Sequence, residues 1–221
     1  GPPLVLLHSL ASSSRSWLQV INPLSRDFAV YALDTLGQGD SDKPPRDYTI
    51  EDYAATVADF VRSLGLGSVI LMGNSMGSVV AIELASAHPD MIDRLVLVGC
   101  VCRENDDDRL AMLERTRSQY DTKGNPKPRV AEDLHGVFFH VTPEALAMVN
   151  GDRKKAGVWG WKASVAVNSY NMVSRLSLIR CRTLLVYGAQ DPFQEKKQVL
   201  LNGIPGVEMV VIERAGHLPQ V

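Results

Sequence analysis

Six short apolar segments, each separated from the next by a longer amphipathic or polar stretch, constrain the fold of this chain more than any other feature. Most of them are continuous apolar runs, which is typical of parallel strands covered by helices on both faces. We therefore expect an α/β fold with a mostly parallel central sheet flanked by helices. The expected strands are Leu4–His8, Ala29–Asp34, Val69–Gly73, Leu95–Gly99, Thr183–Gly188 and Glu208–Ile212.

Two of the intervening segments carry clear helix signals. Thr49 has the chemistry of an N-cap, and the residues after it, 50–64, place their apolar side chains on one helical face. A second helix is expected from about Met76 to Ala87, because the His88-Pro89 dipeptide disfavours its continuation.

Residues 101–179 break this alternation and contain no convincing core strand. They include the charged stretch Glu104–Arg109, a proline-containing loop at Lys123–Arg129 and several amphipathic pieces. We interpret 101–179 as a small helical cap, or lid, inserted into a core formed by 1–100 and 180–221.

The composition excludes several classes of function. The net charge is -2 and no basic cluster is present, which argues against nucleic-acid or membrane-surface binding. No apolar run reaches membrane-spanning length, so a small-molecule substrate is the expected partner, with the protein a monomer or a homodimer. Three cysteines without metal-type spacing predict buried free thiols and a cytoplasmic setting, although the apolar start at Gly1 leaves a removed signal peptide possible.

The pentapeptide Gly73-Asn74-Ser75-Met76-Gly77 lies between an expected strand and an expected helix. A serine on such a tight turn adopts a strained backbone conformation, so small residues are needed two positions to either side. The turn exposes the hydroxyl above the sheet and places it at a helix N-terminus, where developing negative charge is favoured. Ser75 is therefore the candidate nucleophile.

A serine hydroxyl needs a base to remove its proton and a carboxylate to orient that base. His217 and Asp191 each follow an expected strand directly, which places them at the same edge of the sheet as Ser75. His88, His135 and His140 lack a comparable placement. Ser75, Asp191 and His217 therefore form the expected triad, with no metal or organic cofactor.

An acyl-transfer site also needs two backbone N–H groups for the oxyanion. We expect one from Met76 and the other from Leu10, with Ser9 as the second choice. Possible substrate contacts are Asn74 beside the nucleophile and three aromatic residues of the insertion, Phe138, Trp159 and Trp161.

These motifs together resemble the α/β-hydrolase fold superfamily, in its branch of compact esterases and carbon–carbon bond hydrolases of the meta-cleavage type. The order Ser, Asp, His is the one this fold uses. The resemblance covers nearly the whole chain outside the insertion. It rests on the His8 loop with Ser12–Ser14 and Trp17, on Asp34–Ser41, on Gly73–Gly77, on Gly188–Asp191 and on Ala215-Gly216-His217.

The chain departs from the family pattern at three places. Ser9 stands where a glycine usually follows the histidine, Pro192-Phe193 follows Asp191 in place of polar residues, and only four residues follow His217, which suggests a trimmed sequence. A serine at position 9 would disturb the loop if a positive φ were needed there, or would add a hydroxyl near the substrate carbonyl.

Members of the family that this chain resembles catalyse different reactions, so the resemblance leaves several alternatives. A serine nucleophile speaks against haloalkane dehalogenases and epoxide hydrolases, which use aspartate at that position. An asparagine before the serine, here Asn74, resembles the pattern of the carbon–carbon hydrolases. Their glycine-rich oxyanion loop is missing here, however, and Leu218 stands where they have a tryptophan after the histidine. Hydrolysis of a small carboxylic ester, lactone or thioester is the first expectation and carbon–carbon hydrolysis of a dienol-ketone the second. A triad-bearing small-ligand receptor is a third alternative from another class.

Overall fold

A six-stranded parallel sheet forms the centre of the computed structural model, which describes residues 1–221. The strand order is β2-β1-β3-β4-β5-β6. All six expected strands are present within a few residues of their predicted bounds, so the predicted α/β class is confirmed. The strands are β1 (Pro3–Leu7), β2 (Ala29–Leu33), β3 (Val69–Asn74), β4 (Ile92–Val98), β5 (Arg182–Gly188) and β6 (Glu208–Ile212).

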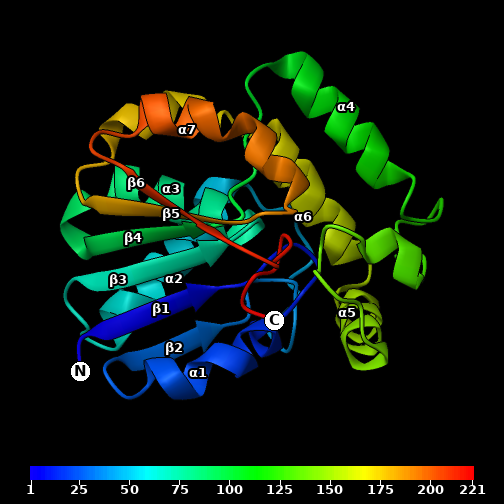
Figure 1. The fold of residues 1–221 in the computed structure, drawn as a ribbon, viewed down its shortest axis with the longest axis horizontal. Helices are drawn as coiled ribbons and strands as arrows, with labels where there is room; N and C mark the ends of the chain where they lie inside the picture. The colour runs from blue at the N-terminus through cyan, green and yellow to red at the C-terminus, as the bar shows by residue number, and fades with distance from the viewer.

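Seven α-helices accompany the sheet (Figure 1). They are α1 (Leu18–Leu24), α2 (Ile50–Ser63), α3 (Met76–Ala87), α4 (Asp106–Arg117), α5 (Pro143–Ala156), α6 (Val158–Ser169) and α7 (Lys197–Gly203). Short 3-10 turns occur at Ser14–Trp17, Pro89–Met91, Ala131–Leu134, Met172–Leu178 and Pro192–Lys196.

Both predicted helices form for the expected local reasons. Thr49 caps α2 by accepting a hydrogen bond from the Asp52 N–H at 3.2 Å, while Asp52 Oδ2 accepts one from the Thr49 N–H at 2.9 Å. This reciprocal pair satisfies two N–H groups that a helix start leaves unpaired. Helix α3 has the predicted bounds and ends just before His88-Pro89.

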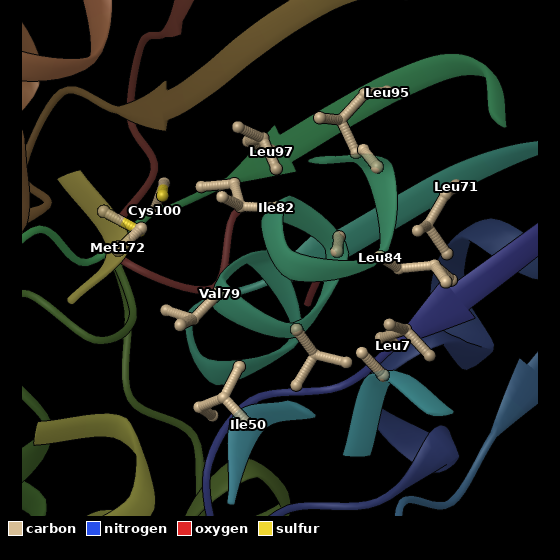
Figure 2. Packing of buried hydrophobic residues seen from close by; sticks show 14 of the residues in the cluster. Leu7, Ile50, Leu71, Val79, Ile82, Leu84, Leu95, Leu97, Cys100 and Met172 are labelled. Carbon is tan, nitrogen blue, oxygen red and sulfur yellow. The ribbon is translucent and has the colours of Figure 1, made fainter. Parts of the chain in front are cut away.

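The two faces of the sheet are covered differently because side chains alternate along each strand. Val5 and Leu7 of β1 join the large core cluster that also contains α2 and α3. Figure 2 shows this packing, with side chains of α3 between those of the strands. Leu4 and Leu6 point to the other face, where they pack with Trp17 and α1.

The cysteines agree with the expectation of free thiols. Cys100 and Cys102 are buried and Cys181 is half-buried, and none of the three forms a disulfide. Burial raises the pKa of the Cys100 thiol to about 12 and that of Cys102 to about 11, so both are thiols rather than thiolates at neutral pH.

The parallel arrangement brings all the carboxyl ends of the strands to one edge. The segment between β4 and β5 contains α4, α5 and α6 and no strand, and Figure 1 shows these helices beyond the tips of the strand arrows. This is the edge at which ligands bind in open α/β sheets. No helix in the structure combines the length and the apolar character needed to cross a bilayer.

Candidate active site

Ser75 occupies a sharp turn between β3 and α3. Its backbone has φ 55° and ψ -113°, a conformation that a side chain makes costly. The turn is held by the Ser75 N–H, which donates to the Val98 carbonyl at 2.9 Å. A Cβ at Gly73 would lie 2.2 Å from the Gly77 carbonyl oxygen, and one at Gly77 would lie 2.3 Å from the Leu7 carbonyl oxygen. Both glycines are therefore required by close backbone approach.

His217 and Asp191 meet at the ends of neighbouring strands. Asp191 follows β5, His217 follows β6, and His217 Nδ1 lies 3.0 Å from Asp191 Oδ2. The other carboxylate oxygen of Asp191 accepts the Phe193 N–H at 2.8 Å, so the carboxylate is fixed on both sides. With Nδ1–H donated to the carboxylate, the lone pair of Nε2 is free to accept a proton.

Ser75 and His217 line one cavity of about 560 Å³, which is also lined by residues of the helical segment between β4 and β5. Asp191 is buried behind His217 and does not line it. No hydrogen bond joins Ser75 Oγ to His217 in this structure. Such contacts are often long until a substrate is bound. The structure thus brings all three expected residues together, with the serine and the imidazole facing the same space.

The expected oxyanion groups lie on the same cavity. Ser9, Leu10 and Met76 all line it. The N–H groups of Ser9 and Leu10 have no hydrogen-bond partner within the protein, and Met76 begins α3, where a helix leaves its first N–H groups unpaired. Ser9 does not adopt a positive φ; Ala11 does, at 52°. The strain at this loop therefore lies two residues beyond the serine that replaces glycine.

Gln38 and His8 hold the Ser9–Leu10 loop in place. The Ala11 N–H donates to Gln38 Oε1 at 2.5 Å, and Gln38 Nε2 donates to Thr35 Oγ1 at 2.9 Å. His8 is completely buried, donates from Nδ1 to the Ser9 carbonyl at 2.7 Å and accepts the Thr35 N–H on Nε2 at 3.0 Å. Burial lowers the pKa of His8, outweighing the bond to Ser9 and the charge of Asp34, so this imidazole is neutral.

Asn74 has a different position from the one expected. It is fully buried, and its Nδ2 donates to the carbonyls of Val98 and His217, both at 3.1 Å. It does not line the cavity, so we correct its assignment from a substrate contact to a residue that ties the His217 loop to the Ser75 turn.

The three aromatic residues named as substrate contacts do not line the Ser75 cavity either. Phe138 packs with Leu134 and Leu218 in a small buried cluster. Trp159 packs against Tyr48, with 5.8 Å between ring centroids, and Trp161 lines a separate cavity of about 610 Å³. These positions correct that expectation. The periodicity of a helix does not reveal which neighbour its aromatic residues will meet.

Several residues that matter to the site were not singled out by the sequence. Gly99 has φ 51°, and a Cβ there would lie 2.8 Å from His217 Nδ1 and 3.0 Å from Asp191 Oδ2. Gly136 of the insertion accepts the His217 N–H at 2.7 Å. Arg103 is buried and lines the cavity. A glycine directly after β4 was a usable signal; the other two contacts depend on how the insertion folds back.

Comparison with known proteins gives a consistent result. The family model of the alpha/beta hydrolase fold matches residues 2–221. The uncharacterized protein Rv2715 of Mycobacterium tuberculosis is 39% identical over 99 residues, which cover 45% of this chain and 29% of that protein. The chain thus matches less than a third of that relative's length.

Two further likenesses extend over nearly the whole chain. The putative carbamate hydrolase RutD of Pseudomonas syringae is 26% identical over 236 aligned residues, covering 100% of this chain and 88% of RutD. The structure of a thermophilic esterase from Thermogutta terrifontis superposes with a TM-score of 0.82 at 27% identity, covering 99% of this chain and 84% of that one.

The comparisons agree in both sequence and fold. The family model leaves out only the first residue, and the resemblance inferred from the motifs is confirmed. The chain belongs to the α/β hydrolase fold family.

Proposed function

We propose that this chain is a serine hydrolase that cleaves a small carboxylic ester, lactone or thioester through an acyl-enzyme. Ser75 is the nucleophile, His217 the general base and Asp191 the group that orients His217. The observation that carries the proposal is the 3.0 Å contact between His217 Nδ1 and Asp191 Oδ2 beside a cavity that Ser75 also lines.

The chemistry follows from this arrangement. His217 Nε2 takes the proton of Ser75 Oγ as Oγ attacks the substrate carbonyl carbon. The carbonyl oxygen becomes an anion, which the N–H groups of Met76 and Leu10 stabilise. Ser9 offers the next N–H along the same loop. The anion collapses, the bond to the alcohol breaks, and His217 gives its proton to the departing oxygen.

Water completes the cycle by the same route. His217 removes a proton from a water molecule, the hydroxide attacks the acyl carbon, and the carboxylic acid leaves as Ser75 regains its proton. Asp191 keeps Nε2 pointed at the reacting atoms and stabilises the imidazolium that forms twice in each turnover. The steps require no metal and no organic cofactor.

Residues 101–179 act in this proposal as a cap over the core. Supporting this, the cavity is lined by core residues such as Ser75 and by insertion residues such as Met112, Leu134 and Met148. The insertion also touches the His217 loop, since the Leu218 N–H donates to the Val137 carbonyl at 2.9 Å. Movement of the cap would therefore be felt at the catalytic histidine.

A panel of p-nitrophenyl esters of increasing acyl length, run beside a ring-cleavage dienoate, tests the reaction. We expect rapid ester hydrolysis that falls at least about 10⁴-fold in kcat for Ser75→Ala. Ser86→Ala is the matched control and should retain activity, because Ser86 lies in α3, the helix that follows Ser75, and its Oγ bonds only the Glu83 carbonyl. Circular dichroism of both variants verifies that they fold.

Other outcomes would replace the proposal. Turnover of the dienoate with little ester hydrolysis would favour carbon–carbon cleavage at the same triad. Ligand binding without turnover of either substrate would favour a receptor. Near-native ester hydrolysis by Ser75→Ala would remove the serine from its role altogether.

A further inference from the structure

Several charged side chains line the cavity that contains Ser75. Four arginines line it, namely Arg103, Arg115, Arg129 and Arg153, against three carboxylates, Glu132, Asp133 and Asp152. A neutral ester requires none of these charges. Which of them are already satisfied within the protein decides whether the cavity is prepared for a charged ligand.

Arg103 is buried without a carboxylate partner. It is 9% exposed, and its guanidinium donates to the Cys102 carbonyl at 2.9 Å and to Asn168 Oδ1 at 3.3 Å. No carboxylate lies within 4.0 Å of it, although a guanidinium has five N–H donors. A buried charge held only by neutral oxygens is costly, so an additional anionic partner would stabilise it.

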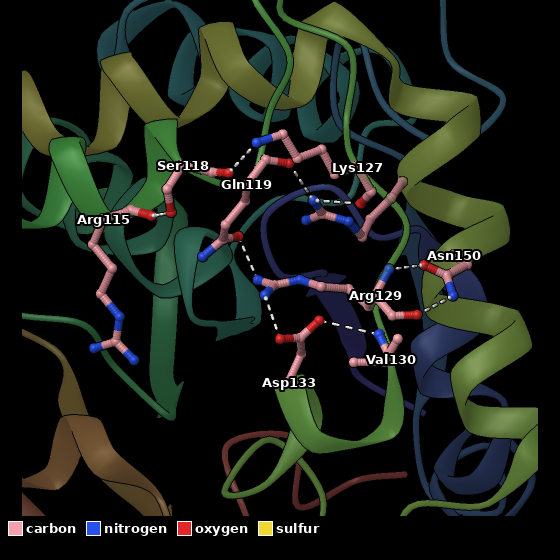
Figure 3. A network of polar contacts seen from close by, with 9 residues as sticks. Arg115, Ser118, Gln119, Lys127, Arg129, Val130, Asp133 and Asn150 are labelled. Atoms are coloured by element: carbon pink, nitrogen blue, oxygen red, sulfur yellow. Dashed lines mark hydrogen bonds and ion pairs between the residues drawn. The ribbon is translucent and has the colours of Figure 1, made fainter.

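Arg115 is the second arginine without a partner. Its side chain is exposed, and its guanidinium forms neither a hydrogen bond nor an ion pair within the protein. In Figure 3 it extends away from the polar network, and only its backbone carbonyl is bonded, by Ser118 Oγ at 2.7 Å. Arg115 therefore reaches the cavity with all its donors free.

The remaining two arginines are engaged in holding the insertion together. Arg129 donates to Gln119 Oε1 and lies 3.9 Å from Asp133 Oδ1 (Figure 3). Arg153 donates to the carbonyls of Gln119 and Lys127 at 3.2 and 3.4 Å and lies over the Tyr120 ring. The charge of Arg129 thus faces a carboxylate, whereas Arg153 is held by neutral oxygens and the Tyr120 ring, and its buried Nε has no hydrogen-bond partner.

The acidic residues of the cavity leave Arg103 and Arg115 uncompensated. Asp133 faces Arg129, Glu132 is exposed, and Asp152 accepts a hydrogen bond from Ser13 Oγ at 2.8 Å. Asp108, from the start of α4, is paired with Lys196 at 3.0 Å.

The same two arginines also act on each other. Burial is the main cause that lowers the pKa of Arg103, the negative charge of Asp108 opposes this, and the positive charge of Arg115 lowers the pKa further. An anion bound to both guanidinium groups would offset this repulsion and part of the cost of burying Arg103.

We propose that the substrate of this site carries a carboxylate, which Arg103 and Arg115 bind while Ser75 attacks an ester elsewhere in the same molecule. This rests on the proposed ester hydrolysis and specifies its substrate class as the half-ester of a dicarboxylic acid or an ester of a hydroxy acid. A carboxylate matches the planar fork of a guanidinium with two parallel hydrogen bonds.

The position of Arg103 relative to the reacting groups supports this assignment. Its Cζ lies 5.4 Å from the centre of the Phe193 ring, and that ring lies 4.7 Å from the centre of the His217 ring. One aromatic side chain thus separates the bound charge from the general base.

Two matched pairs of esters test the proposal. Monomethyl succinate and methyl isohexanoate place a carboxylate or an isopropyl group on the acyl side. Para-acetoxybenzoate and para-isopropylphenyl acetate place a carboxylate or an isopropyl group on the alcohol side of the ester. We expect the charged ester of at least one pair to be preferred about 10- to 100-fold in kcat/KM, the range contributed by hydrogen bonds to a charged group.

Variants assign the preference to the two arginines. Arg103→Gln and Arg115→Gln should each reduce the charged-to-neutral ratio by about tenfold. Arg94→Gln removes the same charge near the opposite end of β4 and should leave the ratio unchanged. Because Arg103 is buried and its variant can unfold, the exposed Arg115 provides the decisive substitution.

A binding measurement separates this inference from the proposed function. Calorimetric titration of Ser75→Ala with succinate should show binding that Ser75→Ala combined with Arg115→Gln lacks. Hydrolysis of neutral esters with no preference in either pair would overturn the carboxylate site and leave ester hydrolysis standing. Arginine-dependent succinate binding without any ester turnover would retain the site and overturn ester hydrolysis. Absence of both would overturn both.

Discussion

Asn74 and His217 are joined by a hydrogen bond from Asn74 Nδ2 to the His217 carbonyl oxygen at 3.1 Å, although 143 positions separate them in the sequence. The same Nδ2 also donates to the Val98 carbonyl at 3.1 Å. One amide group therefore ties the turn that carries Ser75 to the loop that carries His217, and both to the end of β4. This side chain therefore contributes directly to the position of Ser75 relative to His217.

Replacement of Asn74 by alanine should therefore reduce turnover more than substrate binding. The His217 carbonyl would lose the Asn74 donor and the Val98 carbonyl would keep only the Ser75 N–H, at a cost of about 1–3 kcal/mol in the free energy of unfolding. We expect kcat on the preferred p-nitrophenyl ester to fall at least tenfold while KM changes little. Urea unfolding and steady-state kinetics measure both effects. Asn202→Ala, at the exposed end of α7, is the control, and an Asn74 variant with native kcat would contradict the role.

Gly99 offers a test of the crowding around the Asp191–His217 pair. An alanine there would place its Cβ 2.8 Å from His217 Nδ1, so the imidazole must shift. We expect a large loss of kcat with an intact far-ultraviolet spectrum. Gly67→Ala is the matched control, because Gly67 also has a positive φ, 67°, but has open space around it. Both variants should lose about 1 kcal/mol from backbone strain, and only the first should lose activity.

The strained backbone at Ser75 should lower the free energy of unfolding of the protein. Its φ of 55° and ψ of -113° are tolerated by glycine but strained for any residue with a Cβ. Ser75→Gly should therefore be more stable than Ser75→Ala by about 1 kcal/mol, the lower end of the usual strain energy. Chemical denaturation of the two inactive variants gives the difference directly. Equal stability would mean that the turn stores no strain at this position.

His8 should make the stability of the protein depend on pH. Its folded-state pKa lies below the ordinary 6.5 because burial disfavours the charged ring. Between the two values the unfolded chain binds a proton that the folded chain does not, so stability is full above about 6.5 and declines as the pH falls. Unfolding free energies on both sides of 6.5 should show a flatter dependence for His8→Asn than for the native protein. Parallel pH profiles would exclude His8 as the cause.

Much of the fold could be predicted from local patterns. The six apolar runs became the six strands, and the cap at Thr49 and the stop at Pro89 correctly bounded α2 and α3. These features depend on neighbours along the chain, such as the hydrogen bond between Thr49 and Asp52. The loops that bear Ser75, Asp191 and His217 were also predictable, because parallel strands bring their carboxyl ends to one edge.

The surroundings of those loops were not predictable in the same way. Asn74, Trp159 and Trp161 were expected at the substrate and lie elsewhere, while Arg103 and Gly99 went unnoticed. Each of these positions depends on contacts across the insertion or between strand ends, and such contacts leave no periodic trace in the sequence.

The sequence by itself determined the order of strands and helices along the chain and singled out Ser75, Asp191 and His217 as the proposed triad, because hydrophobic periodicity and turn chemistry act locally. Only the tertiary structure decided what surrounds them. Asn74 reaches His217 across two loops. The Gly136 carbonyl of the insertion accepts the His217 N–H. Arg103 lies buried without a counter-charge and donates to Asn168 of α6, 65 positions further along the chain. Packing between distant segments sets these distances, and with them the charge that the cavity presents to a substrate.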